Sequence, residues 1–152
     1  MSPSRHSGRQ STRHEVPRAG TDPIDGAGRA LAMLHVLVAR PLRCETIALL
    51  LDDARCGLGA LVVDGTRHAD SVLDVAHLLA GAAPNHPELQ AVVLASVRPP
   101  ADAACADDVD RWADVDDILH AAGIDLLEWF VVSAGPTPVS CPRDLLGAPA
   151  RW

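Results

Sequence analysis

The sequence predicts an α/β protein of one domain, in which helices pack on the faces of a mixed central β-sheet. Its 152 residues suffice for one sizeable core, and 48% of them are hydrophobic. Short apolar runs typical of buried strands alternate with longer stretches whose apolar residues have helical spacing. The predicted order is helix, strand, strand, helix, strand, helix, strand, with a further short strand near the end.

The first of these stretches predict a helix and a hairpin. Apolar residues at helical spacing predict a helix over residues 25–40, and Pro41 ends it. Residues 45–51 form an apolar run that is dense enough for a central strand. A second strand over residues 58–63 follows so closely that the two strands should pair antiparallel.

The middle of the chain predicts a helix that leads to a buried strand. Residues 68–83 carry an apolar face, and Asp70 or Ser71 is suited to cap that helix. Residues 91–95 are a continuous apolar run, which Arg98-Pro99-Pro100 then stops. A loop that leaves a buried strand and enters a helix is a common place for a functional site.

The last third predicts another helix and two strands. Asp107 or Asp108 is suited to cap a helix over residues 107–122. Residues 126–132 predict a buried strand, and residues 139–141 predict a short final one.

Composition separates a basic N-terminal arm, residues 1–24, from a single domain over residues 25–152. The arm is polar and rich in Ser, Arg, Gly and Pro, so we expect it to be disordered. Residues 1–43 hold seven arginines and three acids, a balance of +4, whereas the rest of the chain has a balance of −11. An acidic body argues against direct nucleic-acid binding. The last residues, 142–152, are expected to be a loose tail.

The four cysteines indicate a reducing environment. Cys44, Cys56, Cys105 and Cys141 are far apart and lack the spacing of a zinc ribbon. No apolar run approaches the ~20 residues of a membrane span, and the N-terminus lacks the apolar region of a signal peptide. These features predict a cytoplasmic protein with reduced thiols and no membrane contact.

Short segments between residues 45 and 140 follow one another as they do in a known family. In chain order they are Glu45 before IALLLDD, then Asp64-Gly65-Thr66 before Ser71-Val72-Leu73, then Ala91-Val92-Val93-Leu94, then the stretch AAGIDLLEW. This order resembles the RadC-like branch of the JAB/MPN family over about two thirds of the chain. The resemblance implies an MPN/JAB architecture, which is similar to that of the cytidine deaminases.

The same resemblance implies a metal pocket that has lost its ligands. In active members a His-x-His-Pro turn and a downstream Asp hold one zinc ion, and a Glu is the general base. Ser96 and Arg98 stand at the two His positions, while Cys105 and Asp108 stand where the family has Ser and Asp. Glu45 matches the base and is therefore a vestigial candidate.

Arg98 argues against zinc binding on physical grounds. A guanidinium stays protonated, has no lone pair to donate and would repel Zn²⁺. One carboxylate and one hydroxyl do not replace two imidazole ligands. Arg98 is expected either to pair with Asp108 or Glu45, or to point into solvent as an ordinary loop residue.

These residues predict a catalytically inactive JAB/MPN-type domain that acts as a protein-binding or scaffold module, without a cofactor and with an unidentified protein partner. One alternative is a zinc-dependent isopeptidase or hydrolase with a divergent metal site. Others are a DNA-repair-associated RadC-like protein and a structural module of a larger assembly. A homodimer is compatible with the sequence, although no feature requires one.

Overall fold

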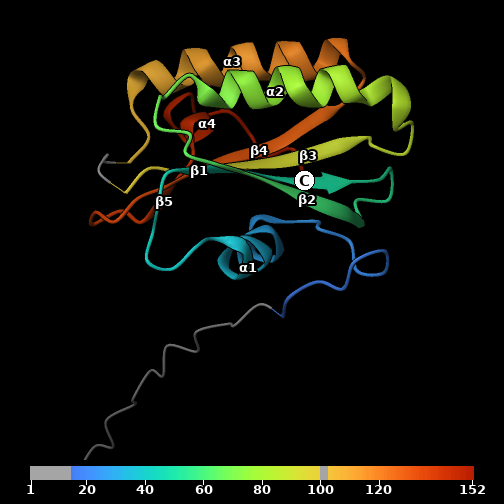
Figure 1. Cartoon of the computed structure of the whole chain (residues 1–152), viewed down its shortest axis with the longest axis horizontal. Helices are drawn as coiled ribbons and strands as arrows, with labels where there is room; N and C mark the ends of the chain where they lie inside the picture. The colour runs from blue at the N-terminus through green and yellow to red at the C-terminus, as the bar shows by residue number, and fades with distance from the viewer. Residues whose placement is uncertain (1–14, 100–102) are drawn as a thin grey trace, which may run out of the picture.

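The computed structural model describes residues 15–99 and 103–152, and it confirms the predicted fold class. The described elements are α1 (Ala27–Leu37), β1 (Glu45–Leu51), β2 (Gly57–Asp64), α2 (Ser71–Ala82), the 3₁₀ turn η1 (Ala83–Asn85), β3 (Ala91–Val97), α3 (Ala106–Ala121), β4 (Asp125–Val132), β5 (Val139–Ser140) and α4 (Pro142–Leu145). One mixed sheet has the order β2-β1-β3-β4-β5, with α1 on one face and α2 and α3 on the other (Figure 1). None of the described helices has the length and apolarity that a membrane crossing needs.

Strand pairing begins with the predicted hairpin. β1 lies between β2 and β3 and pairs antiparallel with both, so the hairpin prediction is confirmed. β3 and β4 are parallel and are joined by the crossover that contains α3. Their carboxyl ends therefore lie side by side, and the loop that was predicted as a site leaves from this point.

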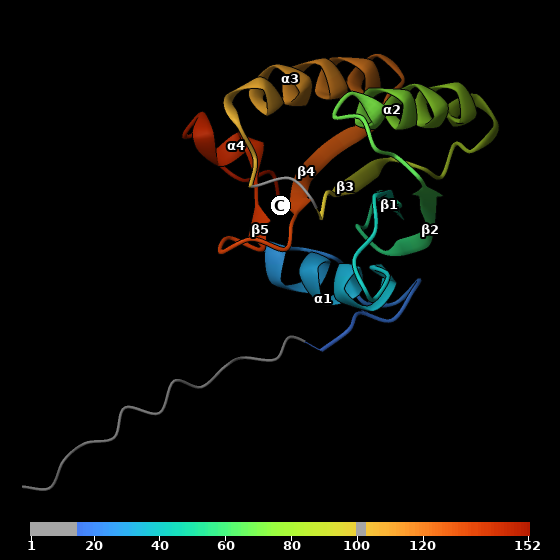
Figure 2. The same ribbon diagram turned by 60° about the vertical axis from the view of Figure 1, so that its left-hand side comes forward.

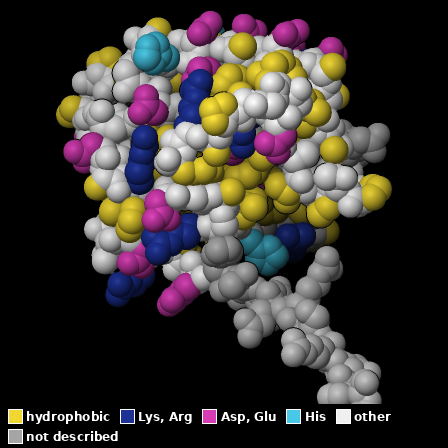
Figure 3. All heavy atoms as spheres, turned by 180° about the vertical axis from the view of Figure 1, so that it is seen from behind, with side chains coloured by type: hydrophobic (Ala, Val, Ile, Leu, Met, Phe, Trp, Pro, Cys, Tyr) yellow, Lys and Arg dark blue, Asp and Glu magenta, His cyan; other side chains and the backbone are white. Residues whose placement is uncertain are grey.

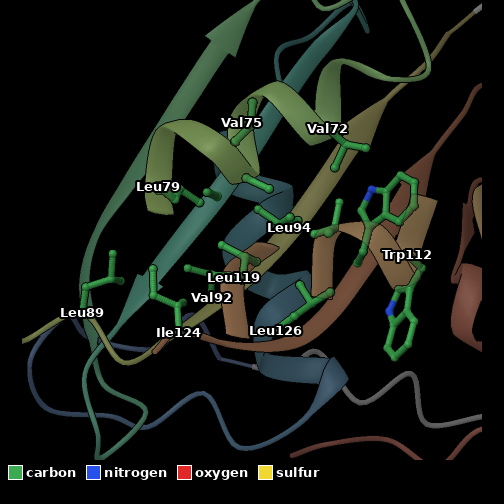
Figure 4. Packing of buried hydrophobic residues seen from close by; sticks show 14 of the residues in the cluster. Val72, Val75, Leu79, Leu89, Val92, Leu94, Trp112, Leu119, Ile124 and Leu126 are labelled. Carbon is green, nitrogen blue, oxygen red and sulfur yellow. The ribbon is translucent and has the colours of Figure 1, made fainter. Parts of the chain in front are cut away.

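The hydrophobic core has two layers, one on each face of the sheet. One layer packs α2 and α3 on the sheet and includes Val75, Leu94 and Leu119 (Figure 4). The other packs α1 on the opposite face, with Leu34 against residues such as Ile47. Because successive strand residues point to opposite faces, the register of each strand decides which layer a given side chain joins.

Residues 15–24, which were predicted to belong to a disordered arm, pack on the domain. Ile24 is 2% exposed and packs in the α1 layer, and its N–H donates to the carbonyl of Arg55 in the hairpin at 2.9 Å. The expectation of a disordered arm over residues 1–24 therefore does not hold for residues 15–24, because the hairpin supplies both a backbone partner and an apolar site. The remainder of that prediction, residues 1–14, lies outside the described residues.

Replacing Ile24 with alanine should lower the free energy of unfolding by about 2–5 kcal/mol, because it empties a buried site in the α1 layer. The matched control is Val16→Ala in the same segment, where the side chain is largely exposed and the expected change is within about 0.5 kcal/mol. Urea unfolding measures both. If Ile24→Ala lowers the free energy of unfolding no more than Val16→Ala does, the segment contributes nothing to the core.

The C-terminal segment is also held more firmly than predicted. α4 packs against α3 and β4 (Figure 2). Arg143 donates from Nε and Nη2 to Oε2 of the buried Glu128 at 2.8 and 2.6 Å. Arg151 forms an ion pair with Asp116. Residues 142–152, which were expected to form a loose tail, thus make specific contacts with the domain, because a glutamate in the middle of a buried strand requires a cation beside it.

Candidate functional site

The loop after β3 brings Arg98 and Asp108 together. Arg98 directly follows β3, and its N–H donates to the carbonyl of Val132 at the end of β4 at 2.8 Å. Asp108 lies in the first turn of α3, the helix that packs beside α2 on one face of the sheet. The parallel pairing of β3 and β4 thus sets the start of the loop, and the crossover returns the chain to the same place ten residues later.

Asp108 is fully buried and is neutralised by two arginines. Arg98 Nη1 donates to both carboxylate oxygens at 3.0 Å, and Arg111 Nη1 donates to Oδ1 at 3.2 Å. The Asp108 side chain is 0% exposed and the Arg98 side chain is 14% exposed. The predicted pair of Arg98 with Asp108 is therefore present, and Arg98 is not a solvated loop residue.

Asp108 also orders the first turn of α3. Cys105, rather than Asp107 or Asp108, is the residue before the helix. Asp108 Oδ2 accepts the Cys105 backbone N–H at 3.0 Å, as the third helical residue does in a capping box. Burial raises the pKa of Asp108, but the Cys105 N–H and the Arg98 guanidinium together outweigh burial and hold that pKa below its usual value of 3.8.

Ser96 and Trp129 form the floor of the cluster. Ser96 is buried, and its Oγ accepts a hydrogen bond from Trp129 Nε1 at 3.0 Å. The Arg98 guanidinium carbon lies 5.5 Å from the centre of the Trp129 ring, within reach of a cation–π interaction. The role of Trp129 was not predicted, because it depends on the register between β3 and β4.

Arg111 connects the cluster to α2. Its Nε donates to Asp70 Oδ1 at 2.7 Å while its Nη1 reaches Asp108. Asp70 was predicted to cap α2, but its carboxylate makes no cap hydrogen bond and binds Arg111 instead. Arg111 was missed in the sequence, although a position three residues after Asp108 on a helix is a recognisable signal for contact.

Glu45 lies on the other face of the sheet from this cluster. It pairs in register with Val97, in the α1 layer, whereas Ser96 pairs with Thr46 on the α2 and α3 side. The Glu45 carboxylate accepts the Ala39 N–H at 2.8 Å, just beyond α1. The prediction that Glu45 belongs to the same pocket, as a vestigial base or as a partner of Arg98, is therefore not supported by its position.

The residues of the cluster do not fit a zinc ion. The buried carboxylate, Asp108, already accepts hydrogen bonds from two arginines and from Cys105. Arg98 can donate no lone pair, and Ser96 Oγ already accepts from Trp129. Within residues 15–99 and 103–152, no three His, Cys, Asp or Glu side chains are grouped so that they could hold a metal ion.

Chemically, the cluster is a neutralised and largely internal ion-pair network. Cys105 is exposed at its rim and donates from Sγ to Asp108 Oδ2 at 3.5 Å. A nucleophilic thiol needs a base or cation to form its thiolate. The nearest acceptor is a carboxylate that is already committed to arginines, so this geometry is suited to structural support rather than to proton transfer.

No family model matches the chain, and no curated protein matches it in sequence.

Proposed function

We propose that this chain is a catalytically inactive domain of the JAB/MPN type that works as a protein-binding or scaffold module. One observation carries the proposal: the Arg98 guanidinium is bonded to the buried Asp108, at the place where the RadC-like resemblance expects a metal ion. The arginine supplies the positive charge that the carboxylate needs, so the loop and the helix start are stable without a metal. A domain of this kind acts through its surface.

The state of the cysteines supports a cytoplasmic location. Cys44, Cys56, Cys105 and Cys141 are all free thiols. Free thiols in every position are typical of proteins that work in a reducing compartment. We therefore propose that the module binds its partner in the cytoplasm.

Surface charge favours a protein partner over a nucleic acid. The exposed face of α3 carries the aspartates Asp107, Asp110, Asp114 and Asp117. Seen from behind, acidic side chains line the top of the molecule, and the arginines on this face are interspersed with acids (Figure 3). Nucleic-acid binding needs a continuous basic surface to neutralise phosphates, and this face does not offer one.

Metal analysis tests the proposal. Protein that has been incubated with excess zinc and then desalted should retain less than about one tenth of an equivalent, because no open set of lone-pair donors surrounds Arg98. It should also leave an isopeptide-linked model peptide uncleaved. Near-stoichiometric zinc that is lost in Asp108→Ala would instead establish the metallohydrolase alternative.

The resemblance itself can be tested by restoring the two histidines. The double variant Ser96→His/Arg98→His should bind about one zinc per chain, through both imidazoles and Asp108. The matched control is Arg98→His alone, which leaves Ser96 without an imidazole and should stay metal-free. A double variant that unfolds cooperatively but binds no zinc would mean that this pocket does not have the family's geometry.

A further inference from the structure

Two side chains on one face of α3 hold the guanidinium of Arg151. Trp112 and Asp116 are four residues apart in the helix, so their side chains lie on the same face. Arg151 donates from Nη1 to Asp116 Oδ1 at 2.5 Å and from Nη2 to Asp116 Oδ2 at 2.9 Å, which is a bidentate pairing. The guanidinium carbon lies 4.8 Å from the centre of the Trp112 ring, within reach of a cation–π interaction. A carboxylate fork and an aromatic face together recognise a guanidinium in particular.

The helix side of this contact is built into the domain, whereas Arg151 is held loosely. Trp112 is 8% exposed and belongs to the layer that packs α2 and α3 on the sheet. The Arg151 side chain is 41% exposed, and the backbone of Pro149 and Ala150 before it makes no hydrogen bond with the described residues. An ion pair that is exposed in this way shifts an equilibrium by a factor of about five at most. Rotation of one side chain therefore frees the site at low cost.

An acidic cavity adjoins the Arg151 guanidinium. Its volume is about 420 Å³, and its lining includes Asp116, Asp117 and Asp125 together with Arg55. Once Arg151 leaves, three aspartates face one arginine, a balance of −2 with the histidine in the lining counted as neutral. The vacated site therefore attracts a cation and offers room for the residues that flank it.

We propose that Trp112 and Asp116 form a docking site for an arginine in a segment of a partner protein, and that Arg151 occupies this site in cis until the partner displaces it. A lysine ammonium lacks both the planar fork and the stacking surface, so the site is selective for arginine. This inference rests on the proposed role as a protein-binding module and gives the chemistry of the partner. It uses no residue of the cluster around Arg98 and Asp108, so it can fail while the chain still retains no zinc.

NMR titration of the full chain with the blocked tripeptide acetyl-Gly-Arg-Gly-amide tests the site. The readout is the indole N–H of Trp112, which is buried and has no hydrogen-bond partner among the described residues. Arg151→Ala should bind the peptide with a dissociation constant of about 1–10 mM, as expected for a ligand of this size. The parent should bind it about fivefold more weakly, because Arg151 competes in cis. The indole N–H of Trp129, which donates to Ser96, should not shift.

Matched variants separate this site from a generally acidic surface. In the Arg151→Ala background, Asp116→Asn should weaken binding at least about tenfold, because the charged half of the fork is lost. Asp114→Asn, on the exposed side of the same helix, should change the dissociation constant by less than about twofold. Peptides in which lysine or the neutral analogue citrulline replaces arginine should bind Arg151→Ala at least about fivefold more weakly.

Four results would overturn the proposal. The first is that Arg151→Ala shows no shift at Trp112, and the second is that the citrulline peptide binds as well as the arginine peptide. The third is tighter binding of free L-arginine than of the blocked peptide, which would identify a small-molecule site. The fourth is a dimer of the parent that Arg151→Ala dissociates, because the occupant would then be Arg151 of a second copy.

Discussion

Asp108→Ala should lower the free energy of unfolding by about 3–5 kcal/mol, measured by urea denaturation. The substitution leaves Arg98, a side chain that is 14% exposed, without its carboxylate partner, and it also removes the cap of α3. Arg98→Ala should cost less, about 1–3 kcal/mol, because Arg111 still neutralises Asp108. The double variant should be more stable than the sum of the two losses predicts, since neither charge is then left alone.

The control for Asp108 is Asp114→Ala on the exposed side of the same helix, which should change stability by less than about 0.5 kcal/mol.

The stability that Asp108 contributes should also depend on pH. The folded state holds the pKa of Asp108 below 3.8. The stability that the ionised carboxylate contributes is therefore complete above pH 3.8 and is lost as the pH falls through the pKa of the folded state. The difference in the free energy of unfolding between the parent and Asp108→Asn should therefore narrow only below about pH 4. A gap that is constant down to pH 2 would contradict a role for the charge.

Arg143→Ala should be comparably destabilising, by about 3–5 kcal/mol, because it leaves the buried Glu128 carboxylate without its ion-pair partner. Replacing both residues, as in Glu128→Leu/Arg143→Met, should recover most of this loss because no buried charge remains. Urea unfolding of the parent and of these two variants measures both changes.

Arg151→Ala is the control for Arg143. The Arg151 side chain is 41% exposed in the ion pair with Asp116, so its removal should cost about 1 kcal/mol or less. If Arg143→Ala is no more destabilising than Arg151→Ala, the C-terminal segment is the loose tail that its composition suggests.

Local patterns were sufficient to predict the strands and one contact between a loop and a helix. The predicted bounds of β1, residues 45–51, are those of the structure, and β2 and β4 differ from their predictions by only one residue at one or both ends. These apolar runs are bounded by turn residues, so each can be recognised without knowing its neighbours. The contact between Arg98 and Asp108 was also predicted, because a strand, a loop and a helix start follow one another directly in the chain.

Only the tertiary structure decided which face each polar side chain occupies and which distant segments hold the domain together. Glu45 and Ser96 stand at the ends of adjacent strands, yet the register between those strands places them on opposite faces of the sheet. Ile24 lies in a segment that was predicted to be disordered, and Arg143 lies in one that was predicted to be a loose tail. Ile24 nevertheless fills an apolar site beside the hairpin, and Arg143 neutralises Glu128. Strand register and long-range burial arise from the packing of the whole sheet. A window of a few residues therefore does not predict them.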